Sequence, residues 1–201
     1  MTEKQIEKIK LSIKKQRAAL SAEKRLYGGF DDSVGRRYHI SDLYLRIGDY
    51  KGAIIYKKWF DKNFPNDIGS PILSMNWAIA FFELDKLPDA TIYTIDTAFQ
   101  TIYRHELLLD REVKPIDMYG QGLDYLEYTQ SMIKHCSKIV TKPYLDWLRT
   151  FVETDEYKVL INRFIALNKL LQDETDNKQR IALLDHIREL ERTNKNRNHD
   201  Q

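Results

Sequence analysis

ISDLYLRIGDYKGA, residues 40–53, is the stretch that decides the fold prediction, because WAIAFFELDKLPDA repeats its pattern at residues 77–90. In both stretches a large apolar residue and a small residue come shortly before an aromatic residue, and an alanine follows after the turn. Tyr44 and Ala53 in the first stretch correspond to Phe81 and Ala90 in the second, a displacement of 37 residues. Apolar runs of helical period on both sides of a polar turn predict a hairpin of two antiparallel helices. The sequence therefore predicts two similar helical hairpins in succession.

The repeated positions resemble those of the tetratricopeptide repeat, a helical hairpin of about 34 residues that stacks on its neighbours. The first hairpin matches this pattern at Ile40, Ser41, Tyr44, Gly48, Asp49, Tyr50, Ala53 and Pro65. The second hairpin matches it at Trp77, Ala78, Phe81, Leu87 and Ala90. Small residues at these positions let paired helices approach closely, while the aromatic residues fill the space between them.

The resemblance covers residues 34–104 and implies an all-α fold. The expected architecture is a short, right-handed superhelix of antiparallel helical hairpins with flanking N- and C-terminal helices. An unrelated helical bundle is the alternative. The sequence departs from the family pattern at Arg37, Ser74, Lys57, Thr94 and Ile102.

Three segments follow from the distribution of apolar residues. Residues 1–27 form a basic, amphipathic N-terminal helix with one apolar stripe, made by Ile6, Ile9, Ile13 and Leu20. Residues 28–193 form a helical repeat domain, with hairpins at 34–67 and 71–104 and further helices across 115–193, the first of them from Asp117 to about Lys138. Residues 194–201 lack apolar periodicity and are expected to be a disordered tail.

The composition points to a soluble, cytoplasmic protein without a cofactor. A formal net charge of +2 is too small to indicate a general nucleic-acid or membrane binder. A single cysteine, Cys136, excludes an intramolecular disulfide, and no uninterrupted apolar stretch is long enough to span a membrane. The histidines form no metal-binding motif, and His135 and Cys136 are neighbours whose side chains diverge on a helix. We therefore expect no enzyme activity, with a site assembled in three dimensions as the alternative.

The family resemblance implies a protein-interaction or scaffold function. In tetratricopeptide repeats the first helix of each hairpin lines a concave groove that binds a peptide or partner protein. By position, the groove here would be lined by Tyr38, Asp42, Leu45, Arg46, Met75, Asn76, Ile79, Phe82 and Glu83. The alternative is that later helices fold over this face and make it part of the core.

The basic charge and the apolar stripe of the N-terminal segment suggest two further alternatives. The first 25 residues contain six Lys and two Arg against three Glu. With Arg36 and Arg37, and with Lys14 and Lys15, they could contact phosphate in a nucleic-acid-associated regulatory protein. The apolar stripe of the N-terminal helix could instead drive homo-oligomerisation, or it could pack on the body of the same chain.

Overall fold

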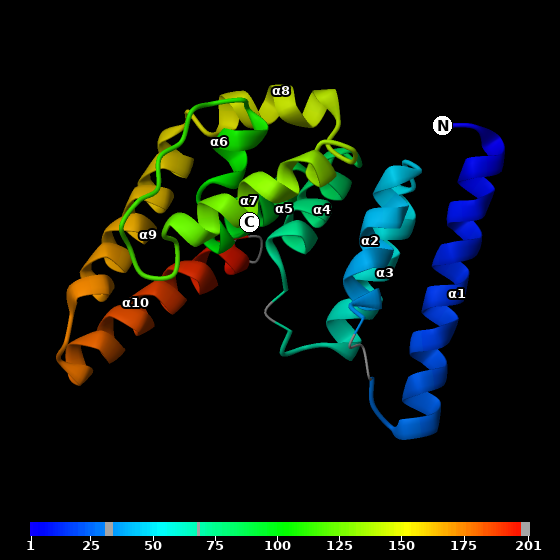
Figure 1. The fold of residues 1–201 in the computed structure, drawn as a ribbon, viewed down its shortest axis with the longest axis horizontal. Coiled ribbons are helices and arrows are strands. Elements are labelled where there is room, and N and C mark those ends of the chain that lie inside the picture. Colours follow the sequence, from blue (N-terminus) through cyan, green and yellow to red (C-terminus); the bar gives the residue numbers. More distant parts are fainter. Residues whose placement is uncertain (31–33, 68, 198–201) are drawn as a thin grey trace.

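The computed structural model describes residues 1–30, 34–67 and 69–197, which form ten helices and no strand. The predicted all-α class is thereby confirmed. Figure 1 shows α1 at one end of the molecule with α2 and α3 beside it, and α9 and α10 at the other end. Their bounds are α1 Glu3–Tyr27, α2 Arg36–Arg46, α3 Tyr50–Asn63, α4 Pro71–Phe82, α5 Leu87–Gln100, α6 Arg104–Leu108, α7 Leu123–Cys136, α8 Lys142–Phe151, α9 Asp155–Asp173 and α10 Asn177–Asn196.

The hairpins α2–α3 and α4–α5 turn with the same backbone geometry. The backbone N–H of Asp49 donates to the carbonyl of Tyr44 at 3.0 Å, and that of Lys86 donates to the carbonyl of Phe81 at 2.9 Å. The residue before each donor adopts a left-handed conformation, at Gly48 (φ 69°) and Asp85 (φ 57°). Each pair of equivalent residues is 37 positions apart, so the repeat that is visible in the sequence is also a repeat of backbone structure.

The small residues of the repeat lie where helices approach one another. Ser41, Ala53, Ala78 and Ala90 are all fully buried. Helix α4 packs against both α2 and α3, and the Asn76 amide donates a hydrogen bond of 2.8 Å to the Ser41 hydroxyl. The rings of Tyr44, Trp59, Phe60 and Trp77 surround the buried ring of Tyr56 between these three helices. The two hairpins thus share one core.

Gly52, near the start of α3, is required by the close approach of Tyr44. A Cβ atom at residue 52 would lie 2.6 Å from Cε1 of the buried Tyr44 ring and 2.4 Å from Oδ2 of Asp49. We expect Gly52→Ala to lower the free energy of unfolding by about 1–3 kcal/mol, despite the better helix propensity of alanine, because the ring must shift. Urea denaturation measures this loss. Gly29→Ala is the matched control, since a Cβ there meets no atom within 4 Å, and an equal effect of both substitutions would contradict the packing argument.

The N-terminal helix α1 packs on the body of its own chain. Ile13 and Leu20 of its apolar stripe are buried against the α2 side of the molecule. Arg17 donates a hydrogen bond of 3.1 Å to the Tyr44 hydroxyl, and the Lys24 ammonium lies 2.6 Å from Oδ1 of Asn63. Ile13 and Leu20 thus pack within the chain, as in the intramolecular alternative, whereas Ile6 and Ile9 are half-buried.

Helix α7 begins at Leu123, six residues later than the predicted start at Asp117. The intervening loop is held by Gln121, whose side-chain amide donates to the carbonyl of Gln100 at 3.0 Å and whose side-chain oxygen accepts from the N–H of Ile102 at 3.3 Å. Gln121, in the loop before α7, thus pairs with backbone groups at the end of α5 that have no partner within that helix. Periodicity could not reveal these long-range bonds.

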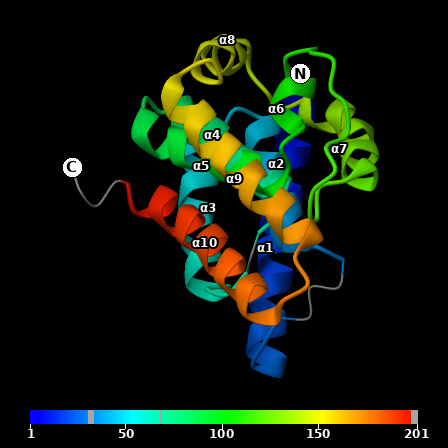
Figure 2. The same cartoon turned by 90° about the vertical axis from the view of Figure 1, so that its left-hand side faces the viewer.

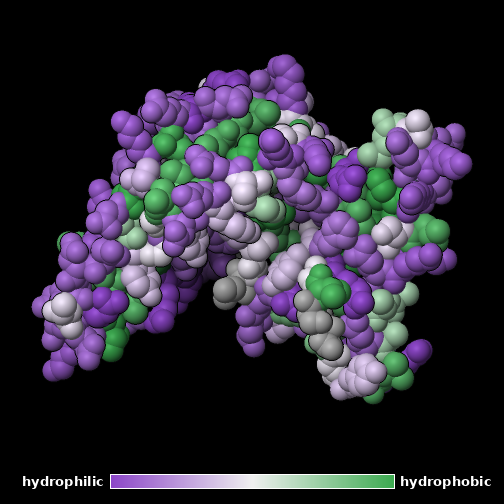
Figure 3. Space-filling model, in the orientation of Figure 1, coloured by the Kyte–Doolittle hydropathy of each residue, from purple (hydrophilic) through white to green (hydrophobic). Residues whose placement is uncertain are grey.

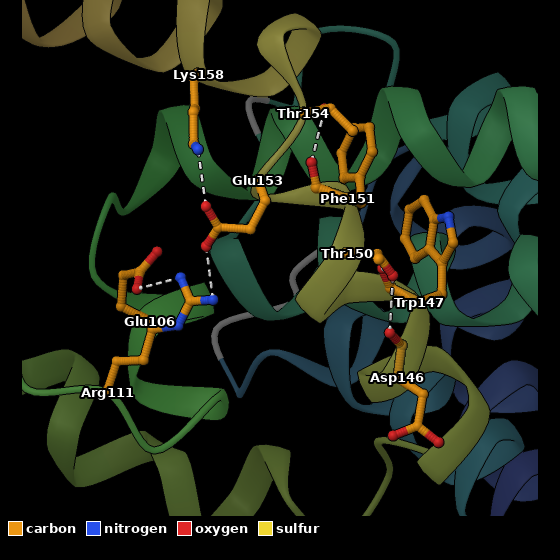
Figure 4. A network of polar contacts seen from close by, with 9 residues as sticks. All are labelled: Glu106, Arg111, Asp146, Trp147, Thr150, Phe151, Glu153, Thr154 and Lys158. Carbon is orange, nitrogen blue, oxygen red and sulfur yellow. Dashed lines mark hydrogen bonds and ion pairs between the residues drawn. The ribbon is translucent and has the colours of Figure 1, made fainter.

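A chain of ion pairs fixes the turn between α8 and α9 against α6 (Figure 4). The Arg111 guanidinium lies 3.1 Å from Oε2 of Glu106 and 2.8 Å from Oε1 of Glu153. The Lys158 ammonium lies 2.7 Å from the other oxygen of Glu153. The hydrogen bond from Lys158 to Glu153 has the largest effect on the Glu153 carboxyl, followed by the hydrogen bond from Arg111. Both lower the pKa of Glu153 below its usual range. The groups are largely exposed, so their role is to orient the turn more than to stabilise the fold.

Helices α9 and α10 form an antiparallel pair at the end of the molecule opposite α1 (Figure 1), and Figure 2 shows the two helices side by side. Helix α10 continues to Asn196, so the tail predicted at residues 194–201 begins too early. The buried Asn194 side chain donates a hydrogen bond of 3.0 Å to the carbonyl of Ile92 in α5, which holds this last turn without any apolar side chain. Residues 198–201 lie outside the described residues.

Candidate functional site

Most residues of the groove predicted on α2 and α4 lie in the interior. Asp42, Leu45, Met75, Asn76 and Ile79 are buried, whereas Tyr38, Phe82 and Glu83 are half-buried and Arg46 is exposed. This face of α2 and α4 is therefore not an open peptide groove in the structure. The alternative, in which later helices cover the face, describes it better.

Helices α7 and α8 supply the cover. Nε2 of His135 in α7 lies 3.0 Å from Oδ1 of Asp42, and the ring centroid of Phe82 lies 5.6 Å from that of Tyr144 and 5.3 Å from that of Trp147 in α8. Thr141, at the start of α8, donates a hydrogen bond to Glu83. The apolar part of the face is thus buried by the chain itself, which is the favourable outcome for a large apolar surface in water.

Tyr38 is separate from the other predicted groove residues. Its hydroxyl lies 2.8 Å from Oδ2 of Asp67, in the connector after α3. The Arg37 guanidinium lies 3.0 Å from the same carboxylate oxygen and 4.8 Å from the centroids of the Tyr38 and Phe64 rings. Tyr38 therefore helps to hold the connector against α2.

The four cations considered for nucleic-acid binding are not gathered into one patch. Arg37 pairs with Asp67, as described, and Arg36 Nη1 lies 2.5 Å from Oε1 of Glu23 in α1. Lys14 and Lys15 are exposed on α1. The two arginines thus tie elements of the fold together, whereas the two lysines face solvent.

Cys136 and His135 point to different parts of the molecule. Cys136 is fully buried and accepts a hydrogen bond of 3.2 Å from the buried guanidinium of Arg104. Burial raises the pKa of the Cys136 thiol, although the positive charge of Arg104 opposes this effect. A neutral, buried thiol is poorly suited to nucleophilic or redox chemistry. Among the described residues, no group of three or more His, Cys, Asp or Glu side chains could hold a metal ion.

A cleft of about 740 Å³ lies where α5, α7 and α10 meet the connector before α4. Figure 3 shows the molecule hollowed next to this place, between the part that ends in α10 and the part formed by α1–α3. Carboxylates, aromatic rings and one ammonium group line the cleft: Asp96, Asp124, Glu191, Phe99, Tyr125, Tyr128 and Lys195. We call it the α5–α7–α10 cleft.

The wall of the cleft on the α7 side carries two exposed tyrosines. Tyr125 and Tyr128 are three residues apart on α7, so their rings project from the same face of the helix. They are 44% and 48% exposed, which is high for aromatic residues that line a concave surface. A buried hydrogen bond of 2.9 Å between Thr129 and Thr101 connects α7 to the end of α5. The tyrosines therefore project from a helix that is anchored in the interior.

The base of the cleft is an anchored carboxylate. Oδ2 of Asp96 accepts hydrogen bonds from the Ser74 hydroxyl at 2.6 Å and from the Gln100 amide at 3.0 Å. Oδ1 lies 3.8 Å from the ammonium of Lys195, beyond hydrogen-bond range. The side chain of Asp96 is only 13% exposed, whereas that of Lys195 is 62% exposed. The carboxylate is thus held by two hydrogen bonds through Oδ2, while the Lys195 ammonium near Oδ1 is largely exposed to solvent.

Glu191 adds a second partly buried carboxyl to the same cleft. Burial raises the pKa of Glu191, and the negative charge of Asp96 raises it further, while Lys195 and Arg188 oppose the shift. With Asp124 at the rim, three carboxyl groups face one ammonium group in this cleft. The local charge is therefore negative, in contrast to the slightly positive net charge of the chain.

Sequence reasoning missed every residue of this cleft. The sequence of α7 did contain a signal for exposed aromatic residues. Tyr125 and Tyr128 lie outside the apolar stripe of this helix, which contains the buried Leu126. Asp96 and Glu191 gave no comparable signal, because they lie 95 positions apart in a chain with 30 acidic residues. Only the packing of α10 on α5 brings them together.

No protein-family model, curated protein or solved structure matches the chain. Within the described residues, no helix has both the length and the apolar character needed to cross a membrane.

Proposed function

We propose that this protein is an interaction module that binds a segment of a partner protein in the α5–α7–α10 cleft. The observation that carries the proposal is the cleft itself, with the two exposed tyrosines of α7 on its wall. Tyrosine is enriched at protein interfaces, because its rigid ring buries a large area and its hydroxyl still forms hydrogen bonds. A volume of about 740 Å³ also lies within the range of about 300–1,000 Å³ that is typical of binding pockets.

The scaffold for this module is a short superhelix of hairpins resembling tetratricopeptide repeats. The 37-residue repeat of turn geometry and the packing of α4 on both α2 and α3 support this assignment. In this proposal the groove of the first two hairpins serves as core, and the binding surface has moved to the outer side of α5. The C-terminal helices would account for both features. Helices α7 and α8 cover the face of α2 and α4, and α7 and α10 form walls of the cleft beside α5.

The charge of the cleft favours this proposal over the nucleic-acid alternative. Asp96, Asp124 and Glu191 would repel phosphate groups, and Arg36 and Arg37 are engaged in ion pairs within the fold. Enzyme activity has weaker support still, since neither Cys136 nor any histidine of residues 1–30, 34–67 and 69–197 lines the cleft.

Peptide display against the purified protein tests the proposed function. We expect selection to enrich peptides that bind the wild-type protein and that lose at least about tenfold in affinity on Tyr125→Ala/Tyr128→Ala, because removing two interface aromatics commonly costs more than about 1.4 kcal/mol. Both tyrosines are substantially exposed, so the double variant should remain folded, and circular dichroism checks this.

Tyr27→Ala is the matched control, because Tyr27 is a highly exposed tyrosine at the end of α1, outside the cleft. The selected peptides should bind this variant as they bind the wild type. Failure to enrich any peptide, or equal binding to the double variant, would refute the cleft as the binding site.

A further inference from the structure

We propose that the α5–α7–α10 cleft recognises a basic segment of a partner protein, with a Lys or Arg side chain inserted between Asp96 and Glu191. This inference rests on the proposed function and adds the chemical class of the partner. Three features carry it: the fixed carboxylate of Asp96, the second carboxyl group of Glu191, and the aromatic wall formed by α7.

Oδ1 of Asp96 accepts no hydrogen bond from the described residues. Ser74 and Gln100 both donate to Oδ2, and the Gln100 amide also donates to the Ser74 hydroxyl at 2.8 Å, so the carboxylate is held in one orientation. Oδ1 is left with Lys195 at 3.8 Å as its nearest cation. A ligand ammonium or guanidinium could approach Oδ1 to about 2.8 Å and form a charge-assisted hydrogen bond. Because the acceptor is already oriented, little ordering entropy opposes that bond.

Negative charge predominates in the cleft, where Asp96, Asp124 and Glu191 face Lys195. Burial and the negative charge of Asp96 raise the pKa of Glu191, whereas Lys195 and Arg188 lower it. The repulsion between the two carboxyl groups is only partly offset, since the Lys195 side chain is 62% exposed and its ammonium lies 3.8 Å from Oδ1 of Asp96. A second cation between the two carboxyl groups would relieve this repulsion. Such a cation is attracted more strongly here than at an open surface, since both carboxyl groups are partly removed from water.

The aromatic wall of the cleft suits the stem of a basic side chain. Lys and Arg side chains have long apolar stems, which bury well against aromatic rings while the charged head reaches a carboxylate. Tyr125 and Tyr128 offer exposed rings beside the acidic base of the cleft, and their faces also attract cations. An acidic segment would be repelled, and a purely apolar one would leave both carboxylates unpaired. The combination therefore selects a basic segment.

Fluorescence anisotropy with defined peptides tests the inference. The probes are two labelled twelve-residue peptides, one of alternating Lys and Ala and the other of alternating Glu and Ala, added to the full-length protein. We expect the Lys peptide to bind and the Glu peptide to show no binding. Asp96→Asn and Glu191→Gln should each weaken binding of the Lys peptide about fivefold, the usual size of one partly exposed charge interaction.

Lys195→Gln should change the affinity for the Lys peptide in the opposite direction to Asp96→Asn. Lys195 competes with the ligand for Asp96, so removing its charge should strengthen binding of the Lys peptide about two- to fivefold. Asp185→Asn is the control: it removes one acidic charge from the exposed side of the same helix, where Asp185 pairs with Arg188. This control should leave the affinity unchanged, whereas a loss equal to that of Asp96→Asn would show that only the overall charge matters and would overturn the inference.

The outcomes also separate this inference from the proposed function. Peptides from the display selection that depend on Tyr125 and Tyr128 but carry no Lys or Arg would leave the function standing and overturn the basic specificity. Binding of spermine as tightly as the Lys peptide, with the same dependence on Asp96, would identify a small polycation as the occupant and would likewise overturn it.

Discussion

Acidification from pH 7 to pH 4 is expected to destabilise this protein steeply, because His105 is held neutral inside the fold. His105 is 1% exposed, and its Nδ1 lies 2.9 Å from the hydroxyl of Tyr157. Burial, together with the positive charge of Arg104, lowers the pKa of His105 to about 3. The short helix α6 carries His105 into the core beneath α9, so protonating its ring would place a second charge beside Arg104.

The direction of the effect follows from proton linkage. Below the ordinary histidine pKa of about 6.5, the unfolded chain binds a proton at His105 that the folded chain does not bind. The free energy of unfolding therefore falls as the pH decreases from about 6.5 towards about 3, by about 1 kcal/mol for each pH unit. The stability that depends on neutral His105 is fully present above pH 6.5.

Urea denaturation at pH 7, 6, 5 and 4 measures this dependence for the wild type and for His105→Gln. Glutamine retains a hydrogen-bonding group near Tyr157 but does not titrate. We expect the variant to be less stable at pH 7 and to lose much less stability on acidification, so that the two curves converge or cross. Parallel curves would show that His105 is not the source of the acid sensitivity.

Tyr144→Ala is expected to cause the largest loss of stability of the substitutions considered. Tyr144 is fully buried in α8, with its ring centroid 5.6 Å from that of Phe82 and 5.5 Å from that of Trp147. Truncating a buried aromatic residue to alanine typically lowers the free energy of unfolding by about 3–5 kcal/mol. The loss should also loosen α8 from α4, because these rings form the contact between them.

Tyr144→Phe separates packing from hydrogen bonding at the same position. The Tyr144 hydroxyl lies 3.0 Å from the buried Oγ1 of Thr94 in α5, and phenylalanine removes only this contact. We expect a loss of about 1 kcal/mol for Tyr144→Phe, measured by the same urea denaturation. Comparable losses for the two substitutions would mean that the hydrogen bond, and not the ring packing, attaches α8.

Local sequence was sufficient to predict the helical hairpins. The apolar period of residues 40–53 and 77–90, the turn at Gly48 and the small residues at Ala53 and Ala90 all act within one hairpin or between adjacent hairpins. Helix formation and tight turns depend on neighbours three or four positions away, so a single sequence displays them. The same logic failed at Asn194, where the last turn of α10 depends on the carbonyl of Ile92.

The position of the candidate site depended on contacts that no local pattern reveals. The family resemblance predicted a groove on α2 and α4. In the structure, α7 and α8 pack on that face and bury it, with contacts such as that between His135 and Asp42. The acidic cleft arises because α10 returns to α5 and brings Glu191 near Asp96.

The sequence by itself thus determined the helices, their turns and the 37-residue repeat, since these follow from short-range periodicity and backbone sterics. Only the tertiary structure decided which face is buried and which is left concave. That choice depends on how much apolar surface each distant helix can remove from water, and on which polar side chains, such as Gln121 and Asn194, find partners when it does.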